Sequence, residues 1–402
     1  MRQRAFTSLF CMAAALSGTA VAFTPAAPDA IIGEIDGVVR QHFYAPGQLG
    51  SLGWDSAVAK ARKALIESSD ESAIDTLLAT LGTSHTAFYS RNDPAYWQMA
   101  SIFEPVLART CVAGVKPLSP VTDNEIGVFW KHIGSAWFVA GLYAGGPADA
   151  AGIEVGDEIV NVNGRPFSPV SAFIEADTPV RLAVRHHQND AVQTIMVTPK
   201  SVRPHEALKQ ATEASWRIVT KGSKRIAYLH VWSWTSIEIQ QVVVQAITKF
   251  NQAGVDGFVL DLRDGWGGAS PNYLTIFNRD VPVLTSIDRD HQKKTYDAQI
   301  RVPAVILING GTRSGKEVVA YGAKKYGLAK LVGEPTAGAV MFGQPFCLSE
   351  GLLYLAVSDA DVDGERLEGN GVKPDVAVPF DVRYAAGSDP QLDRALQLLS
   401  GQ

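Results

Sequence analysis

The stretch from Val302 to Gly322, VPAVILINGGTRSGKEVVAYG, constrains the fold of this protein more than any other. An apolar, β-rich run over 304–308 stops at Asn309-Gly310-Gly311, and a helix is expected to begin near Ser314. The pattern predicts a buried strand, a tight turn and a helix. Such a turn fits two chemistries, either a loop that cradles phosphate or a nucleophilic serine beside the amide of Gly315.

The phosphate alternative requires Gly310 to Lys316 to act as a P-loop. That loop needs Ser or Thr after its lysine to bind Mg²⁺, whereas this sequence has Glu317. A carboxylate at this position would also repel the phosphates. The acidic strand ending at Asp261 precedes the loop instead of following it. These observations argue against an NTPase and favour the serine chemistry.

Residues 1–22 have the pattern of a secretory signal peptide. Arg2 and Arg4 precede a mostly apolar stretch over 5–16, and Ala20-Val21-Ala22 forms an A-x-A cleavage signal. The apolar stretch is too short and too rich in Ser, Gly and Ala for a membrane anchor. We therefore expect a periplasmic or secreted bacterial protein with no stable membrane span.

Composition limits the partners and cofactors. Loss of Arg2 and Arg4 moves the formal charge from −5 to −7, which argues against nucleic acid as a partner. Only Cys111 and Cys347 would remain after processing. Two cysteines make neither a disulfide scaffold nor a zinc site, so we expect no metal and no cofactor. They could pair in an oxidising compartment, but we favour buried thiols.

Changes in the hydrophobic pattern along the sequence predict an α+β multidomain protein. Residues 23–100 show apolar residues at three- and four-residue spacing, which predicts an N-terminal helical domain. Residues 105–200 contain short strands and turns. Residues 202–402 alternate apolar β-runs with helical segments, which predicts a layered α/β core with largely parallel strands. The ending DPQLDRALQLL predicts a helix with an Asp cap.

The middle part carries a recognisable set of turns. Gly146 to Ile153, followed by Val155 to Val160 and Val162-Asn163-Gly164, resembles a PDZ domain. PDZ domains bind the C-termini of polypeptides by adding a strand to a sheet edge and holding the carboxylate with backbone amides. A PDZ fold that serves only as a spacer is the alternative. The residues at the position of the carboxylate loop are Ile126, Gly127, Val128 and Phe129.

Six motifs in a fixed order resemble the tail-specific, or C-terminal processing, serine protease family, which includes the tricorn protease core. The resemblance covers nearly the whole mature protein. It implies a core of the crotonase and ClpP type and a protein or peptide substrate, recognised through its C-terminus. The motifs are Leu81 to Thr86 with Tyr89, the PDZ turns, Leu260 to Arg263 with Gly267-Gly268, Gly311 to Glu317, Tyr326-Gly327 with Val332 to Gly338, and Glu368 to Val376.

The resemblance implies that Ser314 is the nucleophile. Serine attack on a peptide carbonyl also needs a base, a group that orients the base, and donors for the oxyanion. The amide of Gly315 would supply one donor at the positive end of the helix. The second would come from the Gly267-Gly268 turn, where missing side chains let the backbone approach the substrate.

The base is where this sequence departs from much of the family. Many members use a Ser-Lys dyad with the lysine after a T-x-G motif, but here Ala339 follows Thr336-Ala337-Gly338. Lys316 is a poor substitute, because residues i and i+2 of a helix point to different faces. We therefore expect Lys316→Ala to leave hydrolysis largely intact.

The tricorn-like branch uses a histidine preceded by a serine as base, with a glutamate that supports the serine. The matching residues are Ser84, His85 and Glu368, and a histidine near its normal pKa is a competent base at neutral pH. The hypothesis is a serine endopeptidase with a Ser84, His85, Ser314, Glu368 tetrad and no metal. The alternative is a catalytically inactive member that binds peptides or apolar ligands, because Ala339 replaces the dyad lysine.

Overall fold

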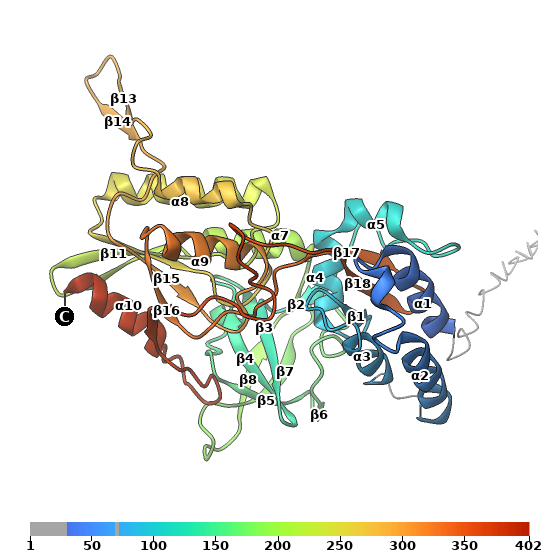
Figure 1. Ribbon diagram of the computed structural model, residues 1–402. Helices are drawn as coiled ribbons and strands as arrows, with labels where there is room; N and C mark the ends of the chain where they lie inside the picture. Colours follow the sequence, from blue (N-terminus) through green and yellow to red (C-terminus); the bar gives the residue numbers. More distant parts are fainter. Residues whose placement is uncertain (1–29, 69–71, 402) are drawn as a thin grey trace, which may run out of the picture.

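The computed structural model describes residues 30–68 and 72–401, so the expected signal peptide, residues 1–22, lies outside the described residues. Among the described residues, no helix combines the length and apolar character needed to cross a membrane. The expected multidomain α+β fold is confirmed by a large mixed assembly of helices and sheets (Figure 1).

A six-stranded sheet forms the centre of the C-terminal part (Figure 1). Strands β11 to β19 of this sheet run parallel, and β10 is antiparallel to its neighbour, as the alternating sequence pattern predicts. Every residue of β12 and β15 is buried, because helices cover both faces. In spatial order the strands are β10 (Arg217–Lys221), β11 (Lys224–His230), β12 (Gly257–Asp261), β15 (Ala304–Ile308), β16 (Lys330–Gly333) and β19 (Val376–Ala377).

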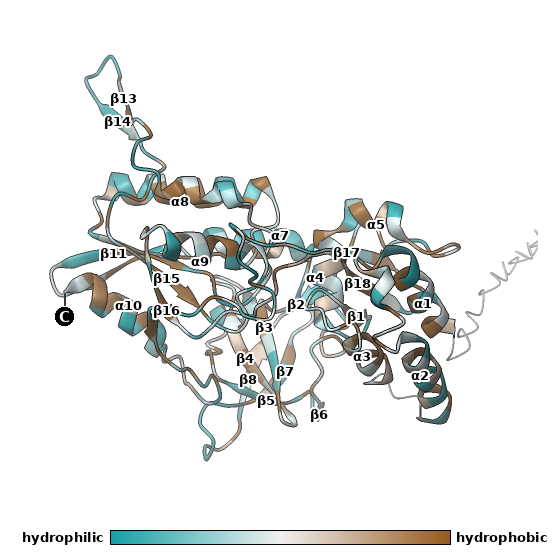
Figure 2. Ribbon diagram, in the orientation of Figure 1, coloured by the Kyte–Doolittle hydropathy of each residue, from teal (hydrophilic) through white to brown (hydrophobic). Residues whose placement is uncertain are grey.

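Helices α8 and α9 cover one face of this sheet, and α10 covers the other. Leu260 belongs to the core shared with α8 and α9, whereas its neighbour Val259 packs with α10, because successive strand side chains point to opposite faces. Hydrophobic and hydrophilic segments alternate along α8 in Figure 2. The predicted cap of α10 is present, since Asp389 accepts a hydrogen bond from Leu392 N at 2.9 Å. The elements of this region are α7 (Pro204–Ala214), α8 (Ile237–Ala253), η2 (Pro271–Phe277), α9 (Gly315–Lys325), α10 (Pro390–Ser400) and a hairpin projecting beyond α8, β13 (Leu284–Ile287) and β14 (Lys293–Tyr296).

The middle part forms a second sheet that docks on the core. Its strand order is β3-β4-β5-β7-β8, with β6 beside β5. The backbone of Tyr384 donates to Gly156 O at 2.9 Å, and a Cβ on Gly156 would lie 2.3 Å from Ala385 N. This close approach fixes the domain against the core. Its elements are β2 (Asp123–Glu125), β3 (Val128–Ile133), β4 (Ala136–Leu142), α6 (Pro147–Ala150), β5 (Glu158–Val162), β6 (Arg165–Pro166), β7 (Val180–Arg185), β8 (Gln193–Val197) and β9 (Lys200–Val202).

The N-terminal helices share a core with a distant hairpin. Strand β1 pairs with β18, which pairs with β17, and residues of α1 to α3 pack with Phe346, Leu348, Leu353 and Leu355. Figure 1 shows β17 and β18 lying beside α1 and α4. Because β1 pairs with β18, the segment that precedes β1 lies near the C-terminal core. The elements are α1 (Ala30–His42), η1 (Pro46–Gln48), α2 (Trp54–Ser68), α3 (Ser72–Ala79), β1 (Ala87–Ser90), α4 (Pro94–Ile102), α5 (Glu104–Thr110), β17 (Phe342–Cys347) and β18 (Gly351–Ser358).

Cys111 and Cys347 form a disulfide, so the expectation of buried thiols is wrong. The two cysteines are 236 residues apart in sequence. Their proximity depends on the pairing of β1 with β18, which lets the end of α5 reach β17. Val112 N also donates to Cys347 O at 3.0 Å beside the bond.

Candidate active site

Ser314 lies on a strained turn between β15 and α9. Its backbone has φ 57° and ψ −130°, in a region that non-glycine residues rarely adopt and that costs about 1–3 kcal/mol. Surrounding hydrogen bonds hold this conformation, because Ser314 N donates to Ala339 O at 2.9 Å and to Glu317 Oε2 at 3.1 Å. Strain of this kind is typical of residues that must present a side chain to a ligand.

Glu317 organises the loop opposite Ser314. The carboxylate is fully buried and accepts hydrogen bonds from Thr336 Oγ1 at 2.5 Å and from the amides of Gly338 and Ala339, both at 2.8 Å. Burial raises its pKa, and these donors oppose that rise. The residue that argued against phosphate therefore fastens the segment 336–339 to the start of α9.

Two of the predicted glycines touch the serine turn. A Cβ on Gly267 would lie 2.5 Å from Ser314 Cβ, and one on Gly315 would lie 2.1 Å from Ala269 O. Gly268 has φ 94°, a conformation that glycine adopts without strain. Within residues 30–68 and 72–401, none of the amides of Gly267, Gly268 and Gly315 donates to another protein group. These amides are therefore available to an oxygen of a ligand.

Lys316 points away from Ser314, as its spacing predicts. Its side chain is fully buried, and Nζ donates to Asp264 O at 2.8 Å and to Trp232 O at 3.4 Å. Burial lowers its pKa to about 7. The lysine thus ties α9 to the turn that carries Gly267. This burial changes the expected result of Lys316→Ala, because truncation would remove the lysine's hydrogen bond to Asp264 O and leave Trp232 O only the amide of Trp266 as donor.

Ser84, His85 and Glu368 come together although they lie far apart in sequence. Ser84 Oγ donates to Glu368 Oε2 at 2.8 Å, and Ser84 Oγ is 3.0 Å from His85 Nδ1. A hydroxyl has one proton, so Ser84 must accept from Nδ1–H of the neutral ring. The lone pair of His85 is then on Nε2. Glu368 therefore selects the ring form that can take a proton.

His85 is neutral at neutral pH. Its side chain is buried, and burial lowers its pKa to about 4. The carboxylate of Glu368 raises the pKa, whereas the guanidinium of Arg313 lowers it. The ring lies 5.5 Å from that of Tyr354, measured between centroids. The buried ring is available as a proton acceptor over the whole neutral range.

His85 and Ser314 line one small cavity of about 90 Å³. They do not hydrogen-bond to each other in the described structure, and such bonds often tighten only when substrate is bound. Ala339, at the position of the dyad lysine, lines the same cavity and leaves no amine there. The other lining residues are Ser84, Tyr89, Met99, Ile102, Phe103, Thr235, Trp266, Gly267, Gly268, Arg313 and Tyr354.

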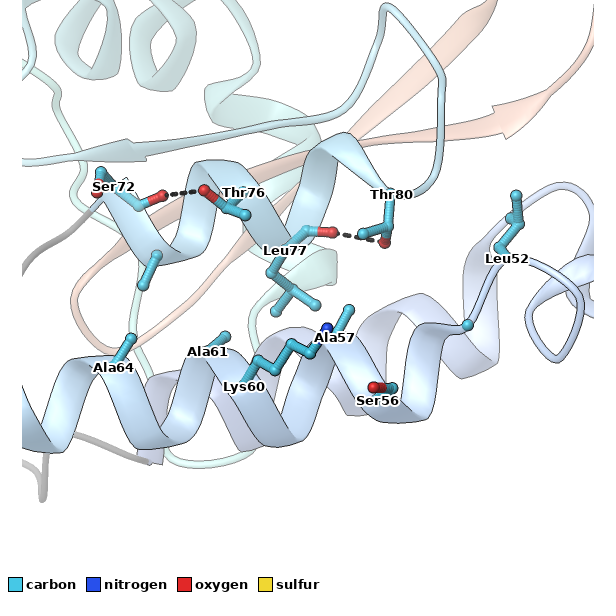
Figure 3. Close-up of a pocket in the computed structure, with 12 residues that line it drawn as sticks. Leu52, Ser56, Ala57, Lys60, Ala61, Ala64, Ser72, Thr76, Leu77 and Thr80 are labelled. Carbon is cyan, nitrogen blue, oxygen red and sulfur yellow. Dashed lines mark hydrogen bonds between the residues drawn. The ribbon is translucent and has the colours of Figure 1, made fainter.

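A second groove, of about 540 Å³, lies between α2 and α3 (Figure 3). Small residues such as Ala57 and Ala61 line it, and Lys60 lies along it. The hydroxyls of Thr76 and Thr80 donate to backbone carbonyls. No histidine is among the described residues that line this groove, unlike the cavity of Ser314.

Residues of the predicted carboxylate loop pack inside the PDZ-like domain and against the C-terminal core. Ile126 and Val128 are buried in the domain core, and Phe129 packs on Trp232 with ring centroids 6.1 Å apart. Gly127 has φ 77°, and its carbonyl accepts from Tyr143 N at 2.9 Å. The loop therefore contacts the protease-like core instead of facing only solvent.

Sequence comparisons assign both domains. Residues 225–378 match Peptidase family S41, and residues 138–185 match a PDZ domain. The protein therefore has an S41 peptidase domain. These matches confirm the family that the six motifs indicated, together with its PDZ domain.

Two relatives of this protein are named processing proteases, and a third is named a tricorn protease homolog. The protein is 26% identical over 277 residues to the carboxyl-terminal-processing protease of Picosynechococcus sp., covering 64% of this sequence and 65% of the relative. It is 26% identical over 323 residues to carboxyl-terminal-processing peptidase 1, chloroplastic, of Arabidopsis thaliana. The match covers 75% of this sequence and 61% of that relative. Tricorn protease homolog 1 of Streptomyces coelicolor is 25% identical over 388 residues. The match covers 90% of this sequence and 34% of that relative. The protein thus spans less than two thirds of the length of these relatives.

Solved structures show the same fold. The tricorn protease superposes with a TM-score of 0.52 at 17% identity, covering 93% of this protein and 36% of tricorn. An S41 protease from Bacteroides fragilis gives a TM-score of 0.51 at 16% identity. The superposition covers 92% of this protein and 97% of that structure. At these identities the likeness supports the architecture alone.

Sequence reasoning missed Arg313, Trp266 and Tyr354, all of which line the cavity. Arg313 carried a usable signal, because it is a charged residue directly before the expected nucleophile. Trp266 also stood beside the predicted Gly267-Gly268 turn. Tyr354 gave no such signal, since only the pairing of β18 with β1 brings it to the site.

Proposed function

We propose that this protein is a serine endopeptidase that cleaves unfolded or C-terminally recognised polypeptides, with Ser314 as nucleophile and His85 as base. One observation carries the proposal. A serine on a strained turn shares a cavity with a buried neutral histidine, and that histidine is oriented by Ser84 and Glu368. This is the nucleophile, base and orienter arrangement of serine acyl transfer.

In the first step Ser314 Oγ bonds to the substrate carbonyl carbon while its proton moves to His85 Nε2. The carbonyl electron pair moves to oxygen, where the amides of Gly315 and the Gly267-Gly268 turn stabilise the charge. Collapse breaks the C–N bond, and the departing amine takes the proton from His85. Water then attacks the acyl carbon while His85 takes its proton. Collapse breaks the bond between this carbon and Ser314 Oγ, which receives the proton from His85, and the acid product leaves. Glu368, acting through Ser84, stabilises the imidazolium in both steps.

We extend the proposal to substrate binding and location. Substrate C-termini dock at the loop of Gly127 beside β3, an edge strand of its sheet, in the strand-addition mode of PDZ domains. The signal-peptide pattern of residues 1–22 supports a periplasmic or secreted protein. The Cys111–Cys347 disulfide supports the same location, because disulfides persist in oxidising compartments.

The test is hydrolysis of an unfolded protein by the wild-type enzyme and by Ser314→Ala and His85→Ala. We expect both variants to lose hydrolysis, and a fluorophosphonate probe to label wild type at Ser314 and not Ser314→Ala. Full activity in His85→Ala would refute the base. An unlabelled wild type that still binds peptides would identify a non-catalytic binding protein, the alternative that Ala339 raises.

A further inference from the structure

The positively charged side chain of Arg313 lies beside the proposed nucleophile, Ser314. It precedes Ser314 on the turn, and both side chains line the cavity of His85. Its guanidinium lies 5.9 Å from the ring centroid of Trp266. That ring is itself fixed, because Trp266 Nε1 donates to Gln98 Oε1 at 2.7 Å. The guanidinium therefore has a defined position against an aromatic wall.

The cavity around Arg313 contains no negative charge. Among the described residues that line it, none is an aspartate or glutamate, and His85 is neutral. Within residues 30–68 and 72–401, Arg313 forms no ion pair, whereas the buried Arg263 and the half-buried Arg301 do. Glu368 is already occupied by Ser84 and by the amide of Val340 at 2.8 Å. The guanidinium of Arg313 thus has the neutral hydroxyl of Tyr89 as a hydrogen-bond partner, but no carboxylate among the described residues that line the cavity.

The remaining walls carry no charge. Met99, Ile102, Phe103 and Tyr354 supply apolar and aromatic surface. A guanidinium in such surroundings forms strong, bidentate hydrogen bonds with a carboxylate and none of comparable strength with an amide. A site built in this way rejects an uncharged analogue because its cation would then be left unpaired.

We propose that Arg313 binds a substrate carboxylate close to the scissile bond, so that the enzyme selects peptides with an acid group at that point. This inference rests on the proposed function. Two sources supply the same chemistry, an acidic side chain beside the cleavage site or the free carboxyl end of a short substrate. Both would pair with the guanidinium in the same cavity.

Binding of the carboxylate also affects catalysis. Arg313 opposes positive charge on His85, because both groups line one cavity. An anion paired with Arg313 cancels that effect when the imidazolium forms. The carboxylate should therefore raise kcat as well as lower KM, a split that a merely structural arginine would not produce.

The test uses the mature protein with quenched fluorescent peptides in matched pairs. One pair differs by Glu or Gln at each position around the cleavage site, with an amidated end. The other differs by a free or amidated end without acidic residues. We expect kcat/KM to be about 10- to 100-fold higher for the acid member of one pair, the range for losing a charged hydrogen bond. The pair that responds identifies the source of the carboxylate.

Variants identify the residue responsible. Arg313→Gln should abolish the preference, Arg313→Lys should retain part of it, and Arg313→Glu should favour a lysine peptide. Arg91→Gln is the matched control, because Arg91 is exposed and does not line the cavity; it should leave the preference unchanged. A preference that persists in folded Arg313→Gln would overturn the inference. Arg313→Lys, the gentler change, decides the matter if the glutamine variant does not fold.

The inference and the proposed function fail in different ways. Equal kcat/KM within both peptide pairs, with Ser314 labelled by the fluorophosphonate, overturns the role of Arg313 and leaves the peptidase standing. If wild type neither labels nor hydrolyses, the peptidase proposal fails. Binding of the same peptides, measured by fluorescence anisotropy, then decides the role of Arg313, and equal affinities within both pairs overturn it.

Discussion

Glu368 accepts hydrogen bonds from both the hydroxyl and the backbone amide of Ser84, at 2.8 and 2.9 Å, across 284 residues of sequence. The same carboxylate accepts from the amide of Val340 at 2.8 Å, next to the loop that Glu317 holds. One carboxylate therefore joins the segment that carries the proposed base to the segment that faces the proposed nucleophile. Its removal should affect geometry and charge together.

We expect Glu368→Gln to lower kcat by between about 10² and 10⁴, because the imidazolium on His85 loses its counter-charge and Ser84 its fixed direction. Steady-state kinetics on a peptide substrate measure this. Glu365→Gln is the matched control, since Glu365 is exposed and three residues away. An unchanged kcat in Glu368→Gln would remove the carboxylate from the mechanism.

The pH profile should reflect the buried state of His85. Burial lowers its pKa to about 4, so the base is neutral above that pH and the acid limb of kcat/KM should lie near pH 4 instead of near 6.5. The measurement uses a peptide without acidic groups. Because Glu368 raises this pKa, the limb should move to lower pH in Glu368→Gln. A limb that stays near pH 6.5 would contradict the buried base.

The same histidine affects stability. Its pKa is lower in the folded protein than in the unfolded state, where it is about 6.5. The contribution of neutral His85 is therefore fully present above about pH 6.5 and is lost as the pH falls toward 4. Denaturant unfolding at several pH values should show a smaller loss of stability over this window in His85→Ala than in wild type.

Gly267→Ala should abolish activity, because the new Cβ would lie 2.5 Å from Ser314 Cβ and 2.7 Å from Arg313 O. The turn would have to move, and the oxyanion donors with it. Gly310→Ala on the neighbouring turn is the control, since a Cβ there meets no atom within 4 Å. Peptide hydrolysis and fluorophosphonate labelling rates compare the two. Equal activity in both variants would show that the Gly267 turn does not contribute donors.

Lys316→Met keeps the apolar stem and removes the donor to Asp264 O and Trp232 O. We expect kcat to fall by up to about 100-fold, because the turn with Gly267 loses its anchor. KM should change little. Lys324→Met, a partly exposed change on the same helix, should have no effect on kcat. Wild-type kinetics in Lys316→Met would show that the turn holds its position without the lysine.

Reduction of the Cys111–Cys347 disulfide should lower the free energy of unfolding by about 2–5 kcal/mol, because the bond closes a long loop. Guanidinium unfolding of wild type and a Cys111→Ser, Cys347→Ser double variant measures this. Reductant should then leave the double variant unchanged. If oxidised and reduced wild type had the same free energy of unfolding, the disulfide would not stabilise the protein.

Local patterns in the sequence predicted what they physically determine. The buried run over 304–308, the turn before Ser314 and the cap at Asp389 follow from side chains close in sequence, and the structure has all three. The grouping of Ser84, His85 and Glu368 required family motifs, since no local rule links residues 284 positions apart.

What the sequence did not predict depends on long-range packing. The disulfide and the position of Tyr354 follow from the pairing of β1 with β18, whose strands are separated by most of the sequence. The role of Lys316 was misjudged in part, because its spacing excludes contact with Ser314 but says nothing of burial. Periodicity gives the direction of a side chain, whereas its partners come from the tertiary fold.

The distance in sequence between Ser84 and Glu368 has a consequence for synthesis. While the protein is being made, Ser84, His85 and then Ser314 appear long before Glu368. A growing polypeptide therefore has the proposed nucleophile before the proposed base can be oriented, and β18, with which β1 pairs, is also made late. In the proposed mechanism, hydrolysis therefore has to wait until the last part of the polypeptide has been made and has folded.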